Sequence, residues 1–195
     1  FDDYEDNNIS EYSGNTSLFQ TSASLVYGGS YGLKAANTSG RTNTTLYRTD
    51  QTTAQGQIIR YMQYIDTTAG SGDEACTLFG VQGAGTNYAV CLEQFGTDRI
   101  SVAKDVVDND TSGSLMLGST TVTYATGWYE VEIDWQSGGD MDVSLYTAAG
   151  SLVATVSASN NSYTSGGIGY AFWFQSGGWD SYTARPRAMT KPTVY

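Results

Sequence analysis

The stretch Trp128-Tyr-Glu-Val-Glu-Ile-Asp-Trp-Gln136 decides the fold that we expect. Its apolar residues, Tyr129, Val131, Ile133 and Trp135, alternate with the acidic residues Glu130, Glu132 and Asp134. This period of two predicts a β-strand with one buried face. The turn Ser137-Gly-Gly139 reverses the chain into residues 140–146, and the turn Ala148-Ala-Gly150 leads to residues 152–156. These three antiparallel strands are predicted to form the middle of a β-sandwich.

The composition agrees with an all-β chain. The 195 residues include 23 Gly and 15 Tyr but only 2 Pro, and no stretch has a convincing apolar period of 3.6 residues. About a dozen short strands separated by turns predict an antiparallel two-sheet β-sandwich with almost no helix. We expect a single domain over residues 1–188, followed by a tail or exit linker over residues 189–195.

The charge balance excludes several functions. The formal net charge is −11, which argues against nucleic acid and anionic membranes as partners, because both attract basic patches. The chain has no His, so catalytic triads of the Ser-His-Asp type are excluded and the commonest zinc ligand is missing. Lysine is restricted to Lys34, Lys104 and Lys191. Such an acidic, lysine-poor surface suits a salt-adapted protein, and an ordinary acidic secreted protein is the alternative.

Cysteines and glycosylation motifs indicate an extracellular protein. Cys76 and Cys91 flank a turn at residues 82–87, and counting outward from that turn places them opposite each other. A cross-strand disulfide is therefore predicted, with a free buried pair as the alternative. Asn-x-Ser/Thr motifs begin at Asn8, Asn15, Asn37, Asn43, Asn109 and Asn160. We expect a glycoprotein outside the cell, on a cell or virion surface, as a mature fragment or a module of a longer chain. No apolar run is long enough to span a membrane, so no membrane insertion is expected.

Five short segments carry a family resemblance. They are Phe1-Asp-Asp-Tyr-Glu-Asp6, Val26-Tyr-Gly-Gly-Ser-Tyr-Gly-Leu33, Gly127-Trp-Tyr-Glu-Val-Glu-Ile-Asp-Trp135, Ser162-Tyr-Thr-Ser-Gly-Gly-Ile-Gly169 and Trp179-Asp-Ser-Tyr182. In this order they resemble the concanavalin A-like lectin/glucanase superfamily, and more narrowly the laminin-G-like jelly-roll modules of microbial surface proteins. The resemblance implies a carbohydrate-binding or adhesive module, often with a structural calcium ion.

The central strand contains the candidate catalytic residues. Glu132-Ile-Asp134-Trp-Gln136 resembles the E-I-D-x-E signature of the retaining β-glucanases in this superfamily. The resemblance makes Glu132 the nucleophile and Asp134 the assisting carboxylate. Gln136 stands at the acid/base position, where an amide cannot donate and recover a proton, so the enzyme hypothesis is disfavoured. The alternative is that these carboxylates form the solvated face of a strand.

A second candidate set is carbohydrate-binding and comprises Trp173, Gln175, Trp179 and Tyr182. Sugar rings stack on exposed aromatic rings, while amides and carboxylates bind their hydroxyl groups. In residues 170–175 the apolar set Tyr170, Phe172 and Phe174 is the better candidate for the core. Trp173 and Gln175 then lie on the opposite face, although each aromatic ring has burial in the core as its alternative.

The third candidate set is metal-binding. Asp2 and Asp3 belong to an acidic segment at the amino end, and Asp180 begins the final strand, which a jelly roll places beside the first. Calcium requires six to eight oxygen ligands, so a structural calcium ion is predicted there.

Taken together, the sequence favours a non-catalytic module that binds glycans or mediates adhesion. A structural subunit of a surface filament or capsid decoration, in contact with other copies of itself, is the second hypothesis. A polysaccharide-degrading enzyme is the third.

Overall fold

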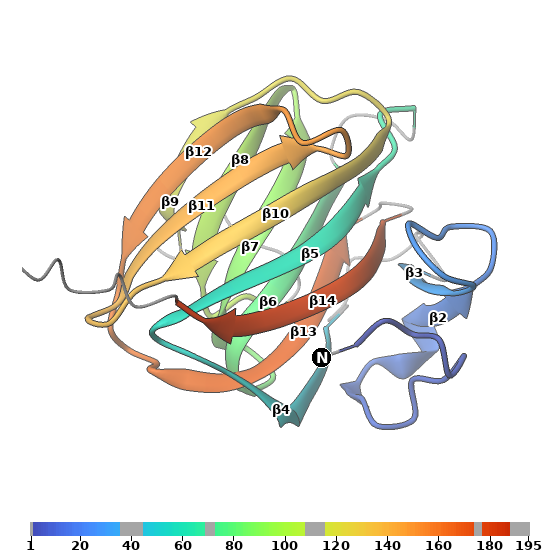
Figure 1. Ribbon diagram of the computed structural model, residues 1–195, viewed down its shortest axis with the longest axis horizontal. Helices are drawn as coiled ribbons and strands as arrows, with labels where there is room; N and C mark the ends of the chain where they lie inside the picture. Colours follow the sequence, from blue (N-terminus) through green and yellow to red (C-terminus); the bar gives the residue numbers. More distant parts are fainter. Residues whose placement is uncertain (1, 36–44, 69–72, 108–115, 174–176, 188–195) are drawn as a thin grey trace, which may run out of the picture.

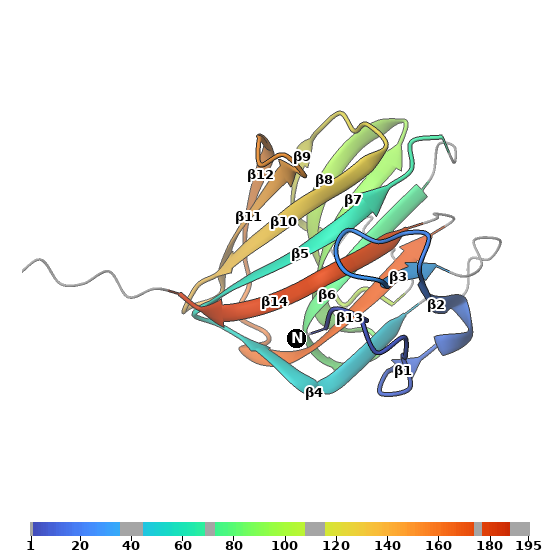
Figure 2. The same cartoon turned by 45° about the vertical axis from the view of Figure 1, so that its right-hand side comes forward.

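The computed structural model describes residues 2–35, 45–68, 73–107, 116–173 and 177–187, and it confirms the predicted antiparallel two-sheet sandwich. Sheet I has the strand order β1-β4-β13-β6-β7-β8-β9, and sheet II has the order β12-β11-β10-β5-β14-β3-β2. In Figure 1 the long strands of sheet II lie in front of those of sheet I, and Figure 2 shows the two layers from the side. The described residues contain no α-helix, only a 3-10 turn over Thr16–Leu18.

The strands have the following bounds: β1 Ser13–Gly14, β2 Phe19–Ser22, β3 Gly32–Ala35, β4 Leu46–Ala54, β5 Gln57–Ile65, β6 Asp73–Gly83, β7 Thr86–Phe95, β8 Thr97–Lys104, β9 Met116–Thr121, β10 Gly127–Trp135, β11 Asp140–Thr147, β12 Leu152–Ser159, β13 Ser165–Trp173 and β14 Gly178–Pro186.

The predicted central meander is confirmed. β10 pairs with β11 over seven residue pairs from Tyr129↔Thr147 to Trp135↔Met141, and β11 pairs with β12. The turn requires its glycines, since Gly138 and Gly139 have φ values of +103° and +95°. A Cβ atom on Gly139 would also lie 2.4 Å from the carbonyl oxygen of Asn160. The hairpin therefore depends on the Ser-Gly-Gly sequence that predicted it.

The core lies between the sheets and is rich in aromatic rings. Trp135 of β10 is fully buried and packs edge-on against Phe79 of β6 and Tyr88 of β7, with ring centroids 5.2 and 5.8 Å apart. The acidic residues that alternate with the buried ones on β10 point away from this core. Burial of large side chains of this kind contributes about 1.5–3 kcal/mol each.

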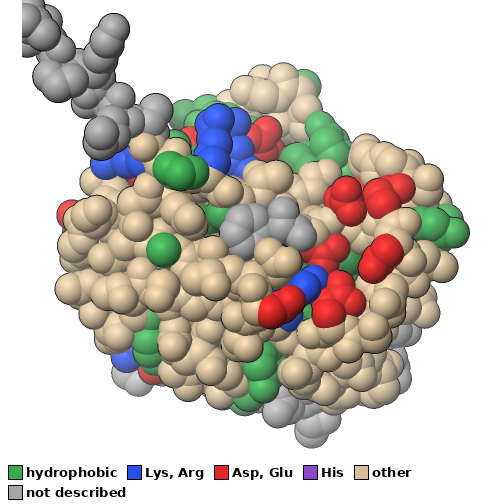
Figure 3. All heavy atoms as spheres, turned by 60° about the horizontal axis from the view of Figure 1, so that its bottom comes forward, with side chains coloured by type: hydrophobic (Ala, Val, Ile, Leu, Met, Phe, Trp, Pro, Cys, Tyr) green, Lys and Arg blue, Asp and Glu red, His purple; other side chains and the backbone are tan. Residues whose placement is uncertain are grey.

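The amino-terminal segment is attached to both sheets. Asp2 forms an isolated β-bridge with Tyr182 of β14, and the amino end lies beside that strand in Figure 1. Arg48 of β4 contacts carboxylate oxygens of Asp2, Glu11 and Asp50 at 3.2, 2.9 and 2.6 Å. Figure 3, which turns the lower edge of Figure 1 forward, shows acidic side chains gathered around a basic one on this face. Arg48 thus joins the amino end to β4.

The predicted tail over residues 189–195 lies outside the described residues, and the single-domain boundary stays a prediction. No helix among the described residues has the length and apolarity that a membrane crossing requires.

Candidate functional site

Strand β13 places Trp173 on the outer face of sheet I. Tyr170 and Phe172 point into the core, as predicted, and are fully buried. Ala171 and Trp173 point the other way because side chains alternate along a strand. Trp173 is partly exposed. The sequence-based placement of this ring on the face opposite the core is therefore correct.

Trp173 begins a row of side chains that crosses four strands. Trp173 is directly opposite Glu74 of β6. Glu74 is opposite Glu93 of β7, and Glu93 is opposite Arg99 of β8. We call these four residues the Trp173 row. Directly opposed residues in an antiparallel sheet have Cβ atoms about 4.5–5.5 Å apart. Two carboxylates are thus side by side between an aromatic ring and a guanidinium group.

The carboxylates of this row are buried and Glu93 is strongly hydrogen-bonded. Glu93 is 0% exposed, and it accepts hydrogen bonds from Arg99 Nε at 2.6 Å and from Ser101 Oγ. Arg99 Nη2 also pairs with Glu93, and this hydrogen bonding raises the pKa of Arg99. The Arg99 side chain remains 33% exposed. A partly exposed guanidinium is therefore held in position by a buried carboxylate.

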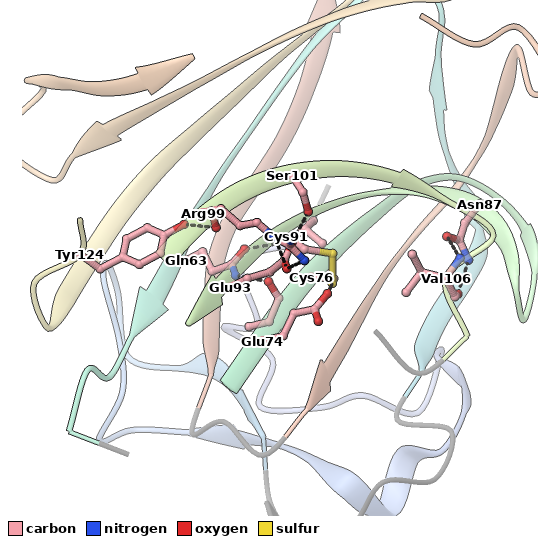
Figure 4. Close-up of a disulfide and its surroundings, with 12 residues drawn as sticks. Gln63, Glu74, Cys76, Asn87, Cys91, Glu93, Arg99, Ser101, Val106 and Tyr124 are labelled. Atoms are coloured by element: carbon pink, nitrogen blue, oxygen red, sulfur yellow. Dashed lines mark hydrogen bonds and ion pairs between the residues drawn. A yellow bond between two sulfur atoms is a disulfide. The ribbon is translucent and has the colours of Figure 1, made fainter. Parts of the chain in front are cut away.

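The next row of the same face is cross-linked by the disulfide. Cys76 and Cys91 are directly opposed on β6 and β7 and are bonded to each other, as the sequence predicted. Figure 4 shows Glu74, Glu93, Arg99 and Ser101 grouped around this bond. The disulfide holds the two strands that supply both carboxylates.

A loop covers the part of the outer face that lies beyond the disulfide. Asn87 Nδ2 donates to the Val106 carbonyl at 2.9 Å, and Val106 N donates to Asn87 Oδ1 at 3.2 Å. Val106 is fully buried in a small apolar cluster with Leu78 and Ala89. Figure 4 shows this contact on the far side of the disulfide from Glu74. The Trp173 row lies on the other side of the disulfide from this loop, and both of its ends, Trp173 and Arg99, are partly exposed.

Several solved structures have the same arrangement of two sheets. The exoplasmic/lumenal domain of VIP36, solved in a Ca²⁺/Man3GlcNAc-bound form, covers 97% of this chain and 89% of its own length, with a TM-score of 0.62 and 11% sequence identity. The legume lectin-like domain from Entamoeba histolytica covers 88% of this chain and 91% of its own length, with a TM-score of 0.56 and 8% sequence identity. The chain has the concanavalin A-like fold.

A glycoside hydrolase contains this fold as one part of a longer chain. The GH43 protein BlXynB from Bacillus licheniformis matches 95% of this chain at a TM-score of 0.60 and 11% identity, and the match spans 39% of that protein. No protein-family model matches the sequence, and no curated protein matches it either. At these identities the comparisons establish the fold alone.

Two predicted sugar-binding residues belong instead to the core of this concanavalin A-like sandwich. Trp179 is 0% exposed and Tyr182 is 1% exposed, so neither ring offers a face to a ligand. Both point inward because β14 shifts its register between Asp180 and Thr183, where Ser181 has a φ of +56°. The prediction was wrong for these two residues, and Gln175 lies outside the described residues.

The predicted catalytic carboxylates lie on the other side of the molecule, on the outer face of sheet II. Glu132 pairs with Arg60, and Asp134 pairs with Arg187 at 2.7 Å. The Gln136 amide donates to Asp142 Oδ2 at 2.7 Å. Neither carboxylate belongs to the Trp173 row, and both are held in ion pairs on a strand face, as the alternative interpretation expected.

The predicted calcium ligands do not converge. Asp2 Oδ2 accepts from Tyr12 Oη at 2.7 Å and from Arg48, and Asp180 Oδ2 accepts from Tyr27 N at 2.8 Å. Asp2, Asp3 and Asp180 do not form a cluster of ligand atoms, since among the described residues the only group of three closely spaced ligand side chains is Glu74 with the disulfide cysteines. An arginine beside Asp2 disfavours a further cation. The described set therefore does not fit calcium as predicted.

The structure describes three of the six glycosylation candidates. Asn8 is exposed, and Asn15 and Asn160 are partly exposed. Asn160 Oδ1 accepts a hydrogen bond from Tyr88 Oη at 2.8 Å. Asn37, Asn43 and Asn109 lie outside the described residues, and glycosylation of all six stays a prediction.

Sequence reasoning missed three of the four residues in the row. The signal was present, because the count that placed Cys76 opposite Cys91 also places Glu74 opposite Glu93, two residues farther from the turn.

Proposed function

We propose that this chain is a non-catalytic carbohydrate-binding module and that a glycan binds along the Trp173 row. The observation that supports this proposal is the alignment of a partly exposed tryptophan, two carboxylates and an arginine across four neighbouring strands. An aromatic ring beside a few fixed polar groups is the usual composition of a small-ligand site.

Three members of the row have a proposed task in binding. The C–H face of a pyranose stacks on Trp173, and the Arg99 guanidinium donates hydrogen bonds to sugar hydroxyl groups. Glu93 orients Arg99, so it is a positioning residue. The disulfide and the buried Glu93 pair hold the donors in place before the ligand arrives, which reduces the entropy lost on binding.

The disulfide and the net charge support a proposal about where the module functions. A disulfide persists in an oxidising compartment, so we place the module outside the cell or on a surface. The net charge of −11 favours neutral over anionic glycans and supports function in high salt.

Replacing Trp173 by Ala is expected to weaken glycan binding by about tenfold to a hundredfold, because a stacking surface worth roughly 1.5–3 kcal/mol is removed. The chain is first applied to a glycan array that includes gluco-, manno-, xylo- and galactohexaose. Affinities are then measured by titration calorimetry. Leu152→Ala, which removes an exposed apolar side chain from β12 of sheet II, is the matched control and should bind like the parent.

The array is run with calcium and with EDTA, and in moderate and high salt. VIP36 was solved with Ca²⁺, whereas the carboxylates predicted to bind calcium here are paired with protein donors. We therefore expect saturable binding in EDTA as well. Absence of binding under every condition would contradict the proposal and favour a structural subunit that contacts its own copies.

A glycosidase is the second candidate, because retaining glycosidases use two carboxyl groups close together and Glu74 is directly opposite Glu93. The same oligosaccharides are incubated with the protein and analysed for shortened products by mass spectrometry. Hydrolysis that disappears in Glu74→Gln would establish this function. The salt bridge of Glu93 with Arg99 favours binding over proton transfer, so we expect intact oligosaccharides.

A further inference from the structure

Three aromatic rings meet on the outer face of sheet II, on the opposite side of the sandwich from the Trp173 row. Trp128 of β10 is directly paired with Tyr64 of β5, and their ring centroids are 5.5 Å apart. Tyr27 packs on the same indole with a centroid distance of 5.9 Å. We call these three residues the Trp128 cluster. It belongs to neither buried core cluster, and Tyr27 is 46% exposed.

The loop that carries Tyr27 is fixed by buried and charged groups. Asp180, which is 1% exposed, accepts hydrogen bonds from the backbone N–H groups of Tyr27 at 2.8 Å and Gly28 at 3.1 Å. Glu5 accepts from the backbone N–H groups of Ser30 at 2.7 Å and Tyr31 at 3.0 Å. These hydrogen bonds lower the pKa of Glu5, so its carboxylate stays charged at neutral pH.

The same loop also packs on the outer face of sheet II. Leu25 lies over Gly178 of β14, where a Cβ atom would come within 2.4 Å of a Leu25 methyl group. Gly178 is the neighbour of Tyr64 in the sheet. The absence of a side chain at Gly178 therefore admits the loop and brings Tyr27 onto Trp128. The position of an exposed ring is thus set by contacts that do not involve the ring itself.

Polar groups flank the rings. Glu130 is two residues from Trp128 on the same face of β10, and Arg60 of β5 lies 3.7 Å from its carboxylate. The Arg60 side chain is 43% exposed. The face therefore offers an aromatic surface together with a hydrogen-bond acceptor and a donor, which is the chemistry that recognises a pyranose ring.

We infer that the Trp128 cluster is a second carbohydrate site, which takes a neutral pyranose unit of a polysaccharide. The three carboxylates of Glu130, Glu132 and Asp134 outnumber the two arginines that pair with them, so the negative charge of uronic or sulfated sugars is disfavoured here.

The inference shares its ligand class with the proposed function but depends on none of the same residues. Two sites on opposite faces of one sandwich cannot bind adjacent units of one short oligosaccharide. The module would instead bridge two polysaccharide chains, and its apparent affinity for an insoluble or branched polysaccharide would exceed its affinity for a hexasaccharide.

The test uses the difference in solvent exposure among the four tryptophans. Trp135 and Trp179 are fully buried, so Trp173→Phe leaves Trp128 as the partly exposed tryptophan among the four. Acrylamide quenching of this variant is measured with gluco-, manno-, xylo- and galactohexaose at millimolar concentrations. At least one neutral hexasaccharide is expected to reduce the quenching constant at least twofold, whereas a galacturonic acid hexasaccharide is expected to leave it unchanged.

The variants decide whether the cluster is responsible. Tyr27→Ala in the Trp173→Phe background is expected to abolish the protection, and Leu152→Ala is expected to retain it. Tyr27→Ala should fold, because Asp180 holds the backbone of this loop, and an unchanged urea midpoint verifies this. Tyr64→Ala in the same background removes the ring that β5 contributes to the cluster, and it is also expected to abolish the protection.

Loss of protection in both aromatic variants would establish the site. Failure of every neutral hexasaccharide to protect Trp128 would overturn the inference. Protection of Trp128 without any effect of Trp173→Ala on binding would overturn the proposed function and leave the second site standing, so the two failures are distinguishable.

Discussion

Replacing Arg99 by Met is expected to destabilise the protein by about 3 kcal/mol, because the variant leaves the carboxylate of Glu93 buried without its counter-charge. Glu93 is 0% exposed, and the hydrogen bond that it accepts from the Ser101 hydroxyl remains in the variant. Urea unfolding followed by tryptophan fluorescence measures the loss.

Two controls separate this effect from a general loss of packing. Arg99→Met combined with Glu93→Gln removes the buried, uncompensated carboxylate charge. This double variant should recover at least half of the free energy of unfolding that Arg99→Met loses. Arg60→Met removes an arginine that is 43% exposed and paired with Glu132, and it should cost less than about 1 kcal/mol. An equal cost for Arg99→Met and Arg60→Met would contradict the assigned burial of the Glu93 pair.

Alkaline pH is expected to unfold the protein steeply above pH 10. Burial is the main cause that raises the pKa of six tyrosines above the usual value near 10, namely Tyr4, Tyr12, Tyr61, Tyr124, Tyr170 and Tyr182. A group with a raised folded-state pKa stabilises fully below its unfolded pKa, and the stabilisation is lost as the pH rises above that value. The unfolded chain then binds fewer protons than the folded one. Six such groups lower the free energy of unfolding by about 8 kcal/mol per pH unit once all are ionised in the unfolded chain.

The measurement combines urea unfolding at pH 8 to 11.5 with the tyrosinate absorbance at 295 nm. We expect the six buried phenols to ionise together with unfolding. Tyr61→Phe removes one titrating group and should reduce the slope by about one sixth. A free energy of unfolding that stays constant between pH 9 and 11.5 would show that these phenols ionise in the folded state.

Hydrophobic alternation predicted most of the fold. Tyr129, Val131, Ile133 and Trp135 are all buried between the sheets, because period-two patterning is a local property of the strand. The turn glycines fixed the register of the hairpin with β11. In the same way, the turn before Tyr88 determined which cysteines meet.

The failures arose where alternation is interrupted or where distant segments meet. Trp179 and Tyr182 are three residues apart and share the inner face, because the register shift after Asp180 adds a residue that alternation cannot anticipate. Tyr27 reaches Trp128 through a loop that Asp180 holds from another strand. Its contact depends on tertiary structure and has no local sequence signal.

The acidic residues show why composition alone did not locate a site. Asp2, Glu132 and Asp134 are paired with arginines that lie far away in the sequence, so these contacts have no local sequence signal. The pairing of Glu74 with Glu93 depends on the register of β6 with β7, which composition does not show.

The most direct test of the central claim is tryptophan oxidation footprinting, read by peptide mass spectrometry. N-bromosuccinimide is applied with and without the neutral hexasaccharide that binds most tightly by calorimetry, and oxidation of each tryptophan is quantified. Trp135 and Trp179 are fully buried and serve as internal references that should stay unmodified. If the glycan occupies the Trp173 row, Trp173 oxidation falls at least fivefold at saturating hexasaccharide. Unchanged oxidation of Trp173 at saturation would contradict the account, because the glycan would then bind elsewhere on the molecule.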